Sequence, residues 1–414
     1  MQNKIIKIHK QIRFVIKTFL RIAFGSVISL FIWRDKKLVL IGNYYSPVFK
    51  INGKKEQFLH NTKYLYLYLN TINTDLKFVY LCDEKDRIEK MRQCGLKNIY
   101  SRKSLKGFYY TLKAKYWITD YDLTVVASPL LSYGAILINL WHGASGLKRF
   151  GYDSDRQNPV KNITNFQSFI YEKLRKKDSY YLVNSKYEIQ CRKTAFNAKE
   201  EQFVLLTSPR LDVLYNNIPN SEMFMEEDFN KIKNFKNAGK KIFIYMPTFR
   251  DTGKDVSSWL KSEKLKLFIG NNNVILVCKL HPSDKNSLNF NFSKNFYLMN
   301  KDSDVHPILK YTDAMITDYS GIYFDYLHLD KPIIYHIPDL HEYETQCRGF
   351  YRPYETLTAG IYTKTDEDII FAMQDVINGV DNYKDKRKAL LDEMFIYKDG
   401  KNCERVVEWI KSLG

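Results

Sequence analysis

Short apolar runs alternate with longer, helix-like segments along almost the whole chain. The runs fall into two series, 38–42, 78–82, 116–119, 135–140, 180–183 and 203–206, and then 242–245, 274–278, 296–299, 314–316 and 333–335. Helix-like segments accompany them, for example at 57–69, 86–93, 366–378 and 403–413. Strands that alternate with helices form a parallel sheet covered on both faces. The sequence therefore predicts the α/β fold class.

The chain has 414 residues, which is too long for one typical domain. A run rich in Asn and Lys at 229–241 separates the two series of strands, and we interpret it as the crossing point between domains. We therefore expect Rossmann-like domains at 35–230 and 231–400 and a C-terminal helix at 401–414. Ile-Thr-Asp-Tyr occurs at 118–121 and again at 316–319, each time at a predicted strand end. Either two similar domains or coincidence explains a match of this length.

The stretch 316–339 is the clearest single unit. An apolar strand leads into the small polar turn 317–321, which a helix and a second apolar run at 332–337 follow. In such a βαβ unit the first turn lies where α/β sheets bind ligands. Backbone N–H groups at the helix start, with the hydroxyls of Tyr319 and Ser320, suit a phosphate or pyrophosphate. An ordinary capped helix, with Ile322, Tyr326 and Leu329 on one side, is the alternative.

The charge of the chain indicates an anionic partner. The formal net charge is +18, and residues 1–34 carry seven basic side chains and no acidic one. The uncharged part of that segment, 22–33, is shorter than the ~20 residues that a spanning helix needs. We expect 1–34 to be a basic amphipathic segment on an anionic membrane surface. A helix docked on the protein and a true anchor are the alternatives.

The six cysteines are scattered, without a CxxC pair or the spacing of a zinc site. This pattern favours reduced thiols, and with the basic segment it predicts a cytoplasmic protein on the inner face of the cell membrane. No helix-turn-helix or aromatic RNA-binding pattern is present, so no nucleic-acid partner is expected. The oligomeric state is open.

The segment 140–151 holds the strongest candidate for chemistry. His142 follows a predicted strand in a turn of small residues, where α/β sites are built, and its pKa range suits a general base. Lys148 and Arg149 add positive charge suited to anionic substrate groups. A structural histidine that caps the turn is the alternative.

Four further segments carry candidates at strand ends or in loops. Arg250 could grip a phosphate with two N–H groups, or it could pair with Asp251 on the surface. His281 could donate to a phosphate or a leaving group, or could be structural. The turn with Arg210 is, taken singly, better interpreted as a solvated surface turn. The aromatic loop around Arg348 could face a base or an acceptor, or could simply pack on the surface.

Six motifs in this order resemble the CDP-glycerol glycerophosphotransferase family, which comprises teichoic acid primases and polymerases and related capsule polymerases. The motifs are WHGASGLKRFG, SPRLD, YMPTFRD, KLHP, ITDYSGIYFDYLHLDKPIIYHIPDLHEY and CRGFY, within residues 135–400. The resemblance implies a GT-B fold, in which two Rossmann-like domains with parallel sheets face each other across a cleft that holds the active site.

The resemblance also implies roles for single residues. His142 would be the base on an acceptor hydroxyl, with His281 as a second catalytic residue. The donor nucleotide would be held by Arg250, His281, Thr317, Asp318, Tyr319 and Ser320, and the family's aspartate in the following helix maps onto Asp325. On their charge and place in the motifs, we also assign Arg210 to the donor, and Lys148, Arg149 and Arg348 to phosphates of the acceptor. The chain departs from the family pattern at Ser208, Gly321 and 358–360, which leaves the donor open.

The expected reaction moves a polyol-phosphate, most simply glycerol-phosphate, from a CDP-linked donor to a hydroxyl of a lipid-linked or polymeric anionic acceptor. CMP would leave, and neither a metal nor another cofactor is expected, because no DxD-like carboxylate cluster stands out. One alternative is a GT-B glycosyltransferase that uses a nucleotide sugar in capsule or lipopolysaccharide synthesis. Another is a non-catalytic membrane scaffold that binds polyanions. The choice between glycerol and ribitol, and between primase and polymerase, stays open.

Overall fold

The computed structural model describes residues 27, 31–42, 58–121, 131–144, 146–154, 179–248, 250, 256–280 and 294–414. The chain divides into two compact units. The first unit contains the described residues up to His142, with 179–182 and 406–414, and the second contains those of 143–164 and 183–405. The expected membrane segment 1–34 lies almost entirely outside the described residues. His281 also lies outside them.

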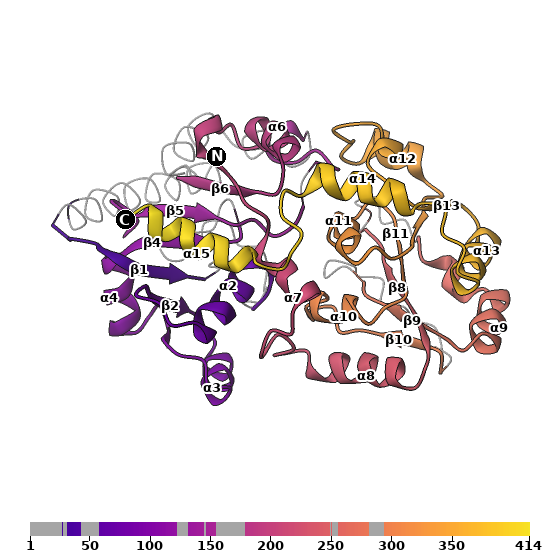
Figure 1. Cartoon of the computed structure of the whole chain (residues 1–414), viewed down its shortest axis with the longest axis horizontal. Coiled ribbons are helices and arrows are strands. Elements are labelled where there is room, and N and C mark those ends of the chain that lie inside the picture. Colours follow the sequence, from indigo (N-terminus) through magenta and orange to yellow (C-terminus); the bar gives the residue numbers. More distant parts are fainter. Residues whose placement is uncertain are drawn as a thin grey trace, which may run out of the picture. The chain divides into compact units, whose positions relative to one another are not determined.

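The first sheet has the strand order β3-β2-β1-β4-β5-β6-β7, and its pairs from β3 to β6 are parallel (Figure 1). Its strands are β1 (Asp35–Ile41), β2 (Lys77–Leu81), β3 (Ile99–Tyr100), β4 (Ala114–Thr119), β5 (Ile136–Asn139), β6 (Tyr180–Val183) and β7 (Phe203–Leu205). The helices along this part of the chain are α2 (His60–Thr71), α3 (Lys85–Gln93), α4 (Leu105–Lys113) and α6 (Lys186–Ala195). Short 3₁₀ turns are η2 (Gly151–Asp153) and η3 (Glu200–Gln202).

The second sheet has the order β10-β9-β8-β11-β12-β13, and all its pairs are parallel. Its strands are β8 (Lys241–Met246), β9 (Val274–Cys278), β10 (Phe296–Leu298), β11 (Ala314–Thr317), β12 (Ile333–His336) and β13 (Ile361–Thr363). The helices along this part of the chain are α7 (Asp212–Tyr215), α8 (Glu226–Asn237), α9 (Glu263–Asn271), α10 (His306–Leu309), α11 (Ile322–Tyr326), α12 (Leu340–Gln346), α13 (Asp366–Ile377), α14 (Lys384–Met394) and α15 (Asn402–Ser412). Most of α15, from Val406 on, belongs to the first unit. The 3₁₀ turns are η4 (Pro209–Leu211), η5 (Ser258–Lys261), η6 (Leu327–Leu329) and η7 (Tyr354–Thr356). The predicted α/β class with parallel sheets is confirmed.

The repeated Ile-Thr-Asp-Tyr occupies equivalent places in the two sheets. The first copy lies at the end of β4, next to β1, and the second lies at the end of β11, next to β8. β1 and β8 are the first strands of the two series. The aspartate of each copy is buried and accepts a hydrogen bond from the segment that follows β1 or β8. Asp120 accepts from the backbone N–H of Thr62 at 3.1 Å, and Asp318 accepts from that of Thr248 at 2.8 Å. The two sheets therefore use the same device at the same topological position.

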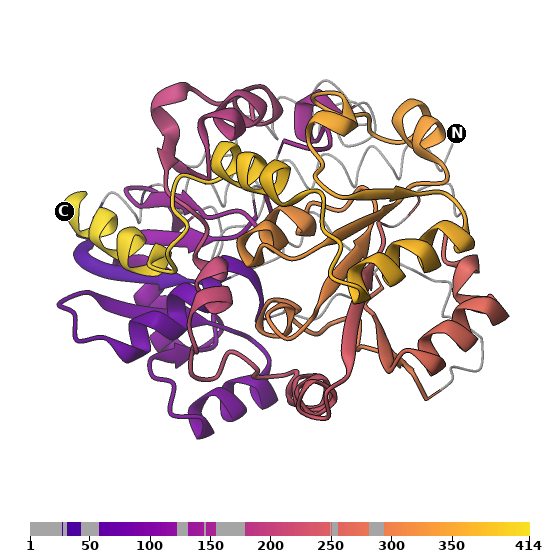
Figure 2. The same cartoon turned by 45° about the vertical axis from the view of Figure 1, so that its right-hand side comes forward.

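Apolar side chains of strands and helices form the core of the second unit. Helices α9 and α13 lie side by side over one face of the second sheet (Figures 1 and 2). Leu265 and Ile269 of α9 and Ile369 and Met373 of α13 are fully buried with the strand residues below them. The apolar spacing of these helices explains their placement, because i, i+4 residues share one side of a helix.

The Asn- and Lys-rich run at 229–241 is largely helix α8, whose first turn is acidic and which buries Ile232. Its interpretation as the crossing point between domains stays a prediction. One expectation about local structure is wrong. The helix after the 317–321 turn is not one-sided, since all residues of 323–327 are buried while Ile322 and Leu329 are only half-buried. None of the helices in the described part of the chain combines the length and apolar character needed to cross a membrane.

We expect His336, at the end of β12, to make the unfolding free energy depend on pH. Its side chain is 6% exposed, its Nδ1 lies 3.2 Å from Thr363 Oγ1, and burial lowers its pKa from 6.5 to about 4. As the pH drops, His336 takes up a proton in the unfolded chain before it does so in the folded protein. The unfolding free energy therefore falls as the pH drops from about 6.5 to about 4. Over that range wild type should lose about 2–3 kcal/mol more than His336→Gln, measured by urea unfolding. The matched control is His341→Gln, at an exposed position; equal pH slopes for His336→Gln and wild type would contradict the prediction.

Candidate functional site

His142 lies just beyond the carboxyl end of β5, in the first unit. Its half-buried ring is stacked on Tyr121, with centroids 4.8 Å apart, and lies against Trp141 at 4.3 Å. Nδ1 is 3.1 Å from the backbone oxygen of Asp120. Because a carbonyl oxygen only accepts, a neutral His142 carries its proton on Nδ1 and its lone pair on Nε2. The ring is thus held in the tautomer that a general base needs.

The backbone that carries His142 is held in an uncommon conformation. Trp141 has φ of 58°, in the left-handed region that residues with a Cβ rarely adopt. Asn61, which is fully buried in α2, donates from Nδ2 to the carbonyl of Leu140 at 2.8 Å and to that of Trp141 at 2.6 Å. On the other side, Trp141 N donates to Asn139 Oδ1 at 2.9 Å. These hydrogen bonds hold the turn in its strained conformation, and strained turns of this kind cluster at functional sites.

We expect Asn61→Asp to weaken both the fold and the activity. The change keeps the size of the side chain but replaces the donor with an oxygen that repels two buried carbonyls. The unfolding free energy should fall by about 1–3 kcal/mol, and turnover of the expected reaction should fall because the turn at His142 loosens. Asn70→Asp is the matched control, since Asn70 also donates to a carbonyl, that of Tyr66, from α2. Wild-type turnover in a folded Asn61→Asp would contradict the expected role.

In the second unit, Arg250 is buried between two carboxylates. It donates to Asp339 in two-pronged fashion, from Nε at 2.8 Å and from Nη2 at 3.0 Å. Nη1 donates to Asp318 Oδ2 at 2.8 Å and to the backbone oxygen of Thr248 at 2.7 Å. Burial alone would lower the pKa of Arg250, but Asp318 and Asp339 outweigh it and raise it. The alternative of a surface arginine paired with Asp251 is wrong, because Arg250 is 3% exposed.

The turn 317–320 presents mainly one side chain outward. Thr317 and Tyr319 are fully buried and Asp318 is 2% exposed, whereas Ser320 is half-buried. The Thr317 hydroxyl donates to the Met246 carbonyl at 2.8 Å, and the Tyr319 hydroxyl donates to Asp339 at 3.0 Å. Of the hydroxyls assigned to the donor, that of Ser320 is therefore the best placed to meet a ligand. The donor-binding roles of Arg250 and the other turn residues stay predictions.

The loop after His142 approaches this turn. A Cβ on Gly321 would lie 3.2 Å from the backbone oxygen of Ala144, which is tighter than most such contacts. The glycine thus allows the close approach at the position where a second serine was expected. Helix α11, which begins at Ile322, has five residues. So short a helix adds little dipole to any phosphate site.

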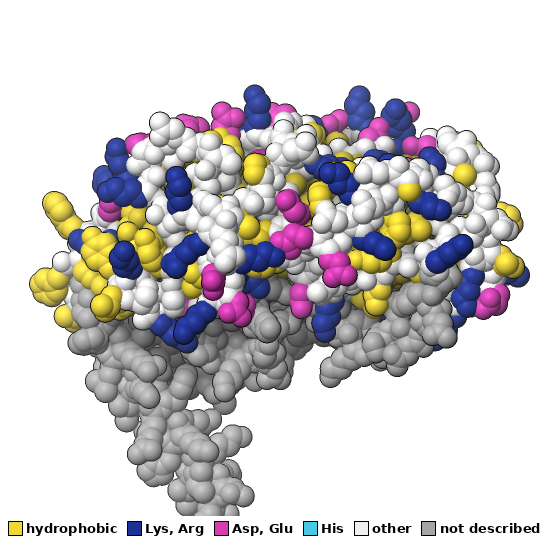
Figure 3. Space-filling model, turned by 90° about the horizontal axis from the view of Figure 1, so that it is seen from below, with side chains coloured by type: hydrophobic (Ala, Val, Ile, Leu, Met, Phe, Trp, Pro, Cys, Tyr) yellow, Lys and Arg dark blue, Asp and Glu magenta, His cyan; other side chains and the backbone are white. Residues whose placement is uncertain are grey.

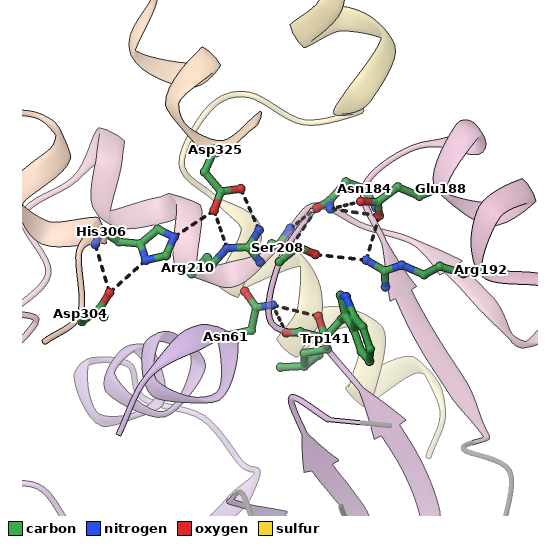
Figure 4. A network of polar contacts seen from close by, with 12 residues as sticks. Asn61, Trp141, Asn184, Glu188, Arg192, Ser208, Arg210, Asp304, His306 and Asp325 are labelled. Atoms are coloured by element: carbon green, nitrogen blue, oxygen red, sulfur yellow. Dashed lines mark hydrogen bonds and ion pairs between the residues drawn. The ribbon is translucent and has the colours of Figure 1, made fainter. Parts of the chain in front are cut away.

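Arg210 and Asp325 form a buried ion pair (Figure 4). Arg210 donates from Nε and Nη2 to the two oxygens of Asp325, both at 2.8 Å. His306 Nε2 lies 2.9 Å from the same carboxylate, and its Nδ1 lies 2.9 Å from Asp304. Burial alone would lower the pKa of His306, but the two aspartates outweigh it and raise it, as suits a ring that donates on both sides. The interpretation of 208–212 as a solvated surface turn is wrong, and a direct donor contact of Arg210 or Asp325 stays a prediction.

The first and last motifs pair with each other in the second unit. Arg149 N donates to the Gly349 carbonyl at 3.2 Å, and Tyr351 N donates to the Leu147 carbonyl at 3.1 Å. Arg149 Nε also donates to the Phe350 carbonyl at 3.2 Å, and Lys148 forms an antiparallel bridge with Phe350. The structure therefore brings the predicted acceptor-side cations, Lys148, Arg149 and Arg348, onto one pair of segments.

Comparison with known proteins decides the family. The model of the CDP-Glycerol:Poly(glycerophosphate) glycerophosphotransferase family matches residues 43–412. The chain belongs to this family. The assignment suggested by the six motifs is confirmed, and the chain is a glycerophosphotransferase-family enzyme.

Curated relatives of this glycerophosphotransferase-family chain are teichoic acid enzymes. It is 28% identical to a teichoic acid poly(glycerol phosphate) polymerase of Bacillus spizizenii, over 91% of this chain and 92% of the relative. It is 26% identical to a teichoic acid glycerol-phosphate primase of Bacillus subtilis, over 75% of this chain and 76% of the relative. With the ribitol-phosphate polymerase TarL of Staphylococcus aureus it shares 28% identity over 72% of this chain but 52% of TarL.

The structure of the wall teichoic acid polymerase TagF has the same fold. The two superpose with a TM-score of 0.72 at 20% identity, over 98% of this chain and 97% of that one. The GT-B-like architecture expected for a glycerophosphotransferase-family member is thus confirmed.

Several residues that organise this glycerophosphotransferase-family site were missed in the sequence. Glu188 and Arg192 form a fully buried pair one helical turn apart in α6 (Figure 4). Arg192 also donates to the Gly143 carbonyl at 3.4 Å, next to His142 in the chain, and Glu188 accepts from Asn184. An i, i+4 Glu–Arg pair is usually a surface feature, so its spacing gave no signal of burial. Asp339 and His306 likewise carry no local pattern that reveals their partners.

Proposed function

We propose that this protein transfers a polyol-phosphate, most simply glycerol-phosphate, from a CDP-linked donor to a hydroxyl group of a teichoic-acid-like or other membrane-linked acceptor. Family membership supports the reaction class, and the relatives named above act on glycerol- and ribitol-phosphate. The observation that carries the mechanism is the contact of His142 Nδ1 with the Asp120 carbonyl. It leaves the basic lone pair on Nε2.

In the proposed reaction the acceptor hydroxyl attacks the β-phosphorus of the donor. A phosphorus–oxygen bond forms to the acceptor while the bond to the bridging oxygen breaks, and CMP departs with the electron pair. His142 Nε2 takes the hydroxyl proton. Ser320 and Arg250, with His281, would bind and neutralise the donor phosphates, and Lys148, Arg149 and Arg348 would hold the anionic acceptor. The proposed reaction uses no metal or other cofactor.

We also place the enzyme at the cytoplasmic face of the cell membrane, where lipid-linked acceptors lie. The basic segment 1–34 and the formal charge of +18 support this location through attraction to anionic lipids. The same charge supports binding of a polyanionic acceptor polymer.

The experiment is a donor panel with the purified protein and a water-soluble, glycerol-phosphate-primed acceptor. CDP-glycerol, CDP-ribitol and nucleotide sugars are supplied singly, and the mass of the acceptor is measured. The proposal expects a gain of one or more polyol-phosphate units with at least one CDP-polyol. A gain of sugar from a nucleotide sugar would favour the glycosyltransferase alternative instead.

A further inference from the structure

A second histidine lies beside His142 in the first unit. It is His60, the first residue of α2, whose ring centroid lies 5.7 Å from that of His142 and 5.9 Å from that of Tyr121. Tyr121 is itself stacked on His142. All three side chains are half-buried, so each ring keeps part of its surface exposed. We call these three residues the His60 cluster.

Hydrogen bonds of the two following residues fix His60 beside the turn that carries His142. Asn61 donates to two backbone carbonyls of that turn, at 2.8 and 2.6 Å (Figure 4). Thr62 donates to the buried carboxylate of Asp120, from its backbone N at 3.1 Å and from its hydroxyl at 2.5 Å. The start of α2 is therefore held at two points, and the place of His60 beside His142 follows from them.

His60 also has an uncommon backbone conformation. Its φ is 61°, in the left-handed region, and Trp141 next to His142 has φ of 58°. Residues with a Cβ cost free energy in this region, and such residues cluster at functional sites. A half-buried histidine adds little to the core, so packing does not account for the strain at His60. A role in the site does.

The surface charge alone does not align the end of an acceptor. Figure 3 shows Lys and Arg side chains spread over one face of the protein, among Asp and Glu side chains and apolar ones. Charge that is spread in this way attracts a polyanion without placing its end. Transfer requires the reacting hydroxyl to be held against its base. A ligand for the acceptor close to His142 would supply this alignment.

We propose that His60 binds the acceptor by donating a hydrogen bond to the phosphate nearest the hydroxyl that His142 deprotonates. An imidazole carries at least one N–H group in either protonation state, so it can donate to a phosphate oxygen. In a polyol-phosphate unit a short carbon chain separates the hydroxyl from its phosphate. Two neighbouring imidazoles, one as base and one as phosphate ligand, suit this spacing. The inference rests on the proposed function and adds a residue that fixes the acceptor.

The test measures transfer at varied concentrations of the water-soluble, glycerol-phosphate-primed acceptor. His60→Phe keeps a ring that can pack on Tyr121 and His142 but removes both nitrogens, whereas His60→Gln keeps an N–H group and loses the ring. We expect His60→Phe to raise the KM of the acceptor by about tenfold or more, with kcat and the KM of the donor within about threefold of wild type. His60→Gln should keep the KM of the acceptor within about threefold.

The control is His341→Phe, at an exposed position in the second unit, which should leave both KM values unchanged. Melting temperatures check that the variants are folded. The reverse order, with normal kinetics for His60→Phe and impaired kinetics for His60→Gln, would overturn the proposal, because the ring would then serve packing alone. A fall in kcat without a change in the KM of the acceptor would also overturn it, since His60 would then act on the chemical step.

A second measurement uses the wild-type protein without donor. In a sample with labelled histidine rings, added acceptor should shift the NMR signal that is missing from His60→Gln; an unchanged signal would overturn the proposal. No turnover of wild type with any CDP-polyol would contradict the proposed function and this inference with it. Normal turnover with an unchanged acceptor KM in His60→Phe would overturn the role of His60 alone.

Discussion

Replacing His142 with alanine is expected to slow the transfer reaction by about 10²–10⁴-fold, the usual contribution of a general base. Without the imidazole the acceptor hydroxyl must lose its proton to water, while the donor phosphates still bind. The loss should therefore appear in kcat more than in the KM of the CDP-linked donor. It is measured as steady-state CMP release at varied donor concentration.

The matched control is His341→Ala, an exposed histidine in the second unit, which should release CMP at nearly the wild-type rate. Circular dichroism and the melting temperature check that both variants are folded. A folded His142→Ala enzyme within a few-fold of wild type would mean that another group takes the proton.

Replacing Asp325 with alanine should reduce the unfolding free energy of the protein by about 3–5 kcal/mol. The change leaves Arg210, which is 0% exposed, without its two-pronged partner and leaves one side of His306 without its acceptor. Burial alone would raise the pKa of Asp325, but Arg210 and His306 outweigh it and hold it low, so the carboxylate stays charged in the folded state. Urea unfolding near neutral pH measures the loss.

Two further variants show whether the loss comes from an unpaired charge. Glu367→Ala removes an exposed partner of Lys264, 2.6 Å away, and should cost less than about 1 kcal/mol. Arg210→Met combined with Asp325→Leu removes both charges and should be more stable than Asp325→Ala alone. If Asp325→Ala kept full stability and only raised the KM for the donor, Asp325 would be a donor ligand and not a member of this buried network.

The sequence predicted much of the fold because strand and helix periods are local signals. The strands at 180–183 and 274–278 fall where they were expected, since continuous apolar runs mark buried parallel strands. The strands β3, with two residues, and β13, with three, were missed because they are too short to show a pattern of apolar residues in the sequence. Helix α8 was missed because a lysine-rich, asparagine-rich composition hid the single buried Ile232.

The site was less predictable, because its geometry depends on contacts between distant segments. The position of His142 after a strand could be read from the chain, and so could the polar turn around Ser320. That Arg250 meets Asp339, which is 89 residues away, could not. Nor could the partnership of Arg210 with Asp325 across 115 residues. These long-range ion pairs hold side chains that were assigned to the donor from the sequence, and no local pattern reveals their partners.

The central claim is attack of an acceptor hydroxyl on the β-phosphorus of a CDP-linked donor. The measurement that tests it most directly is the identity of the nucleotide released from CDP-glycerol, by mass spectrometry, with and without acceptor. We predict CMP in amounts equal to the glycerol-phosphate gained by the acceptor, from wild type and scarcely from His142→Ala. Release of CDP, or of CMP without any gain by the acceptor, would contradict it.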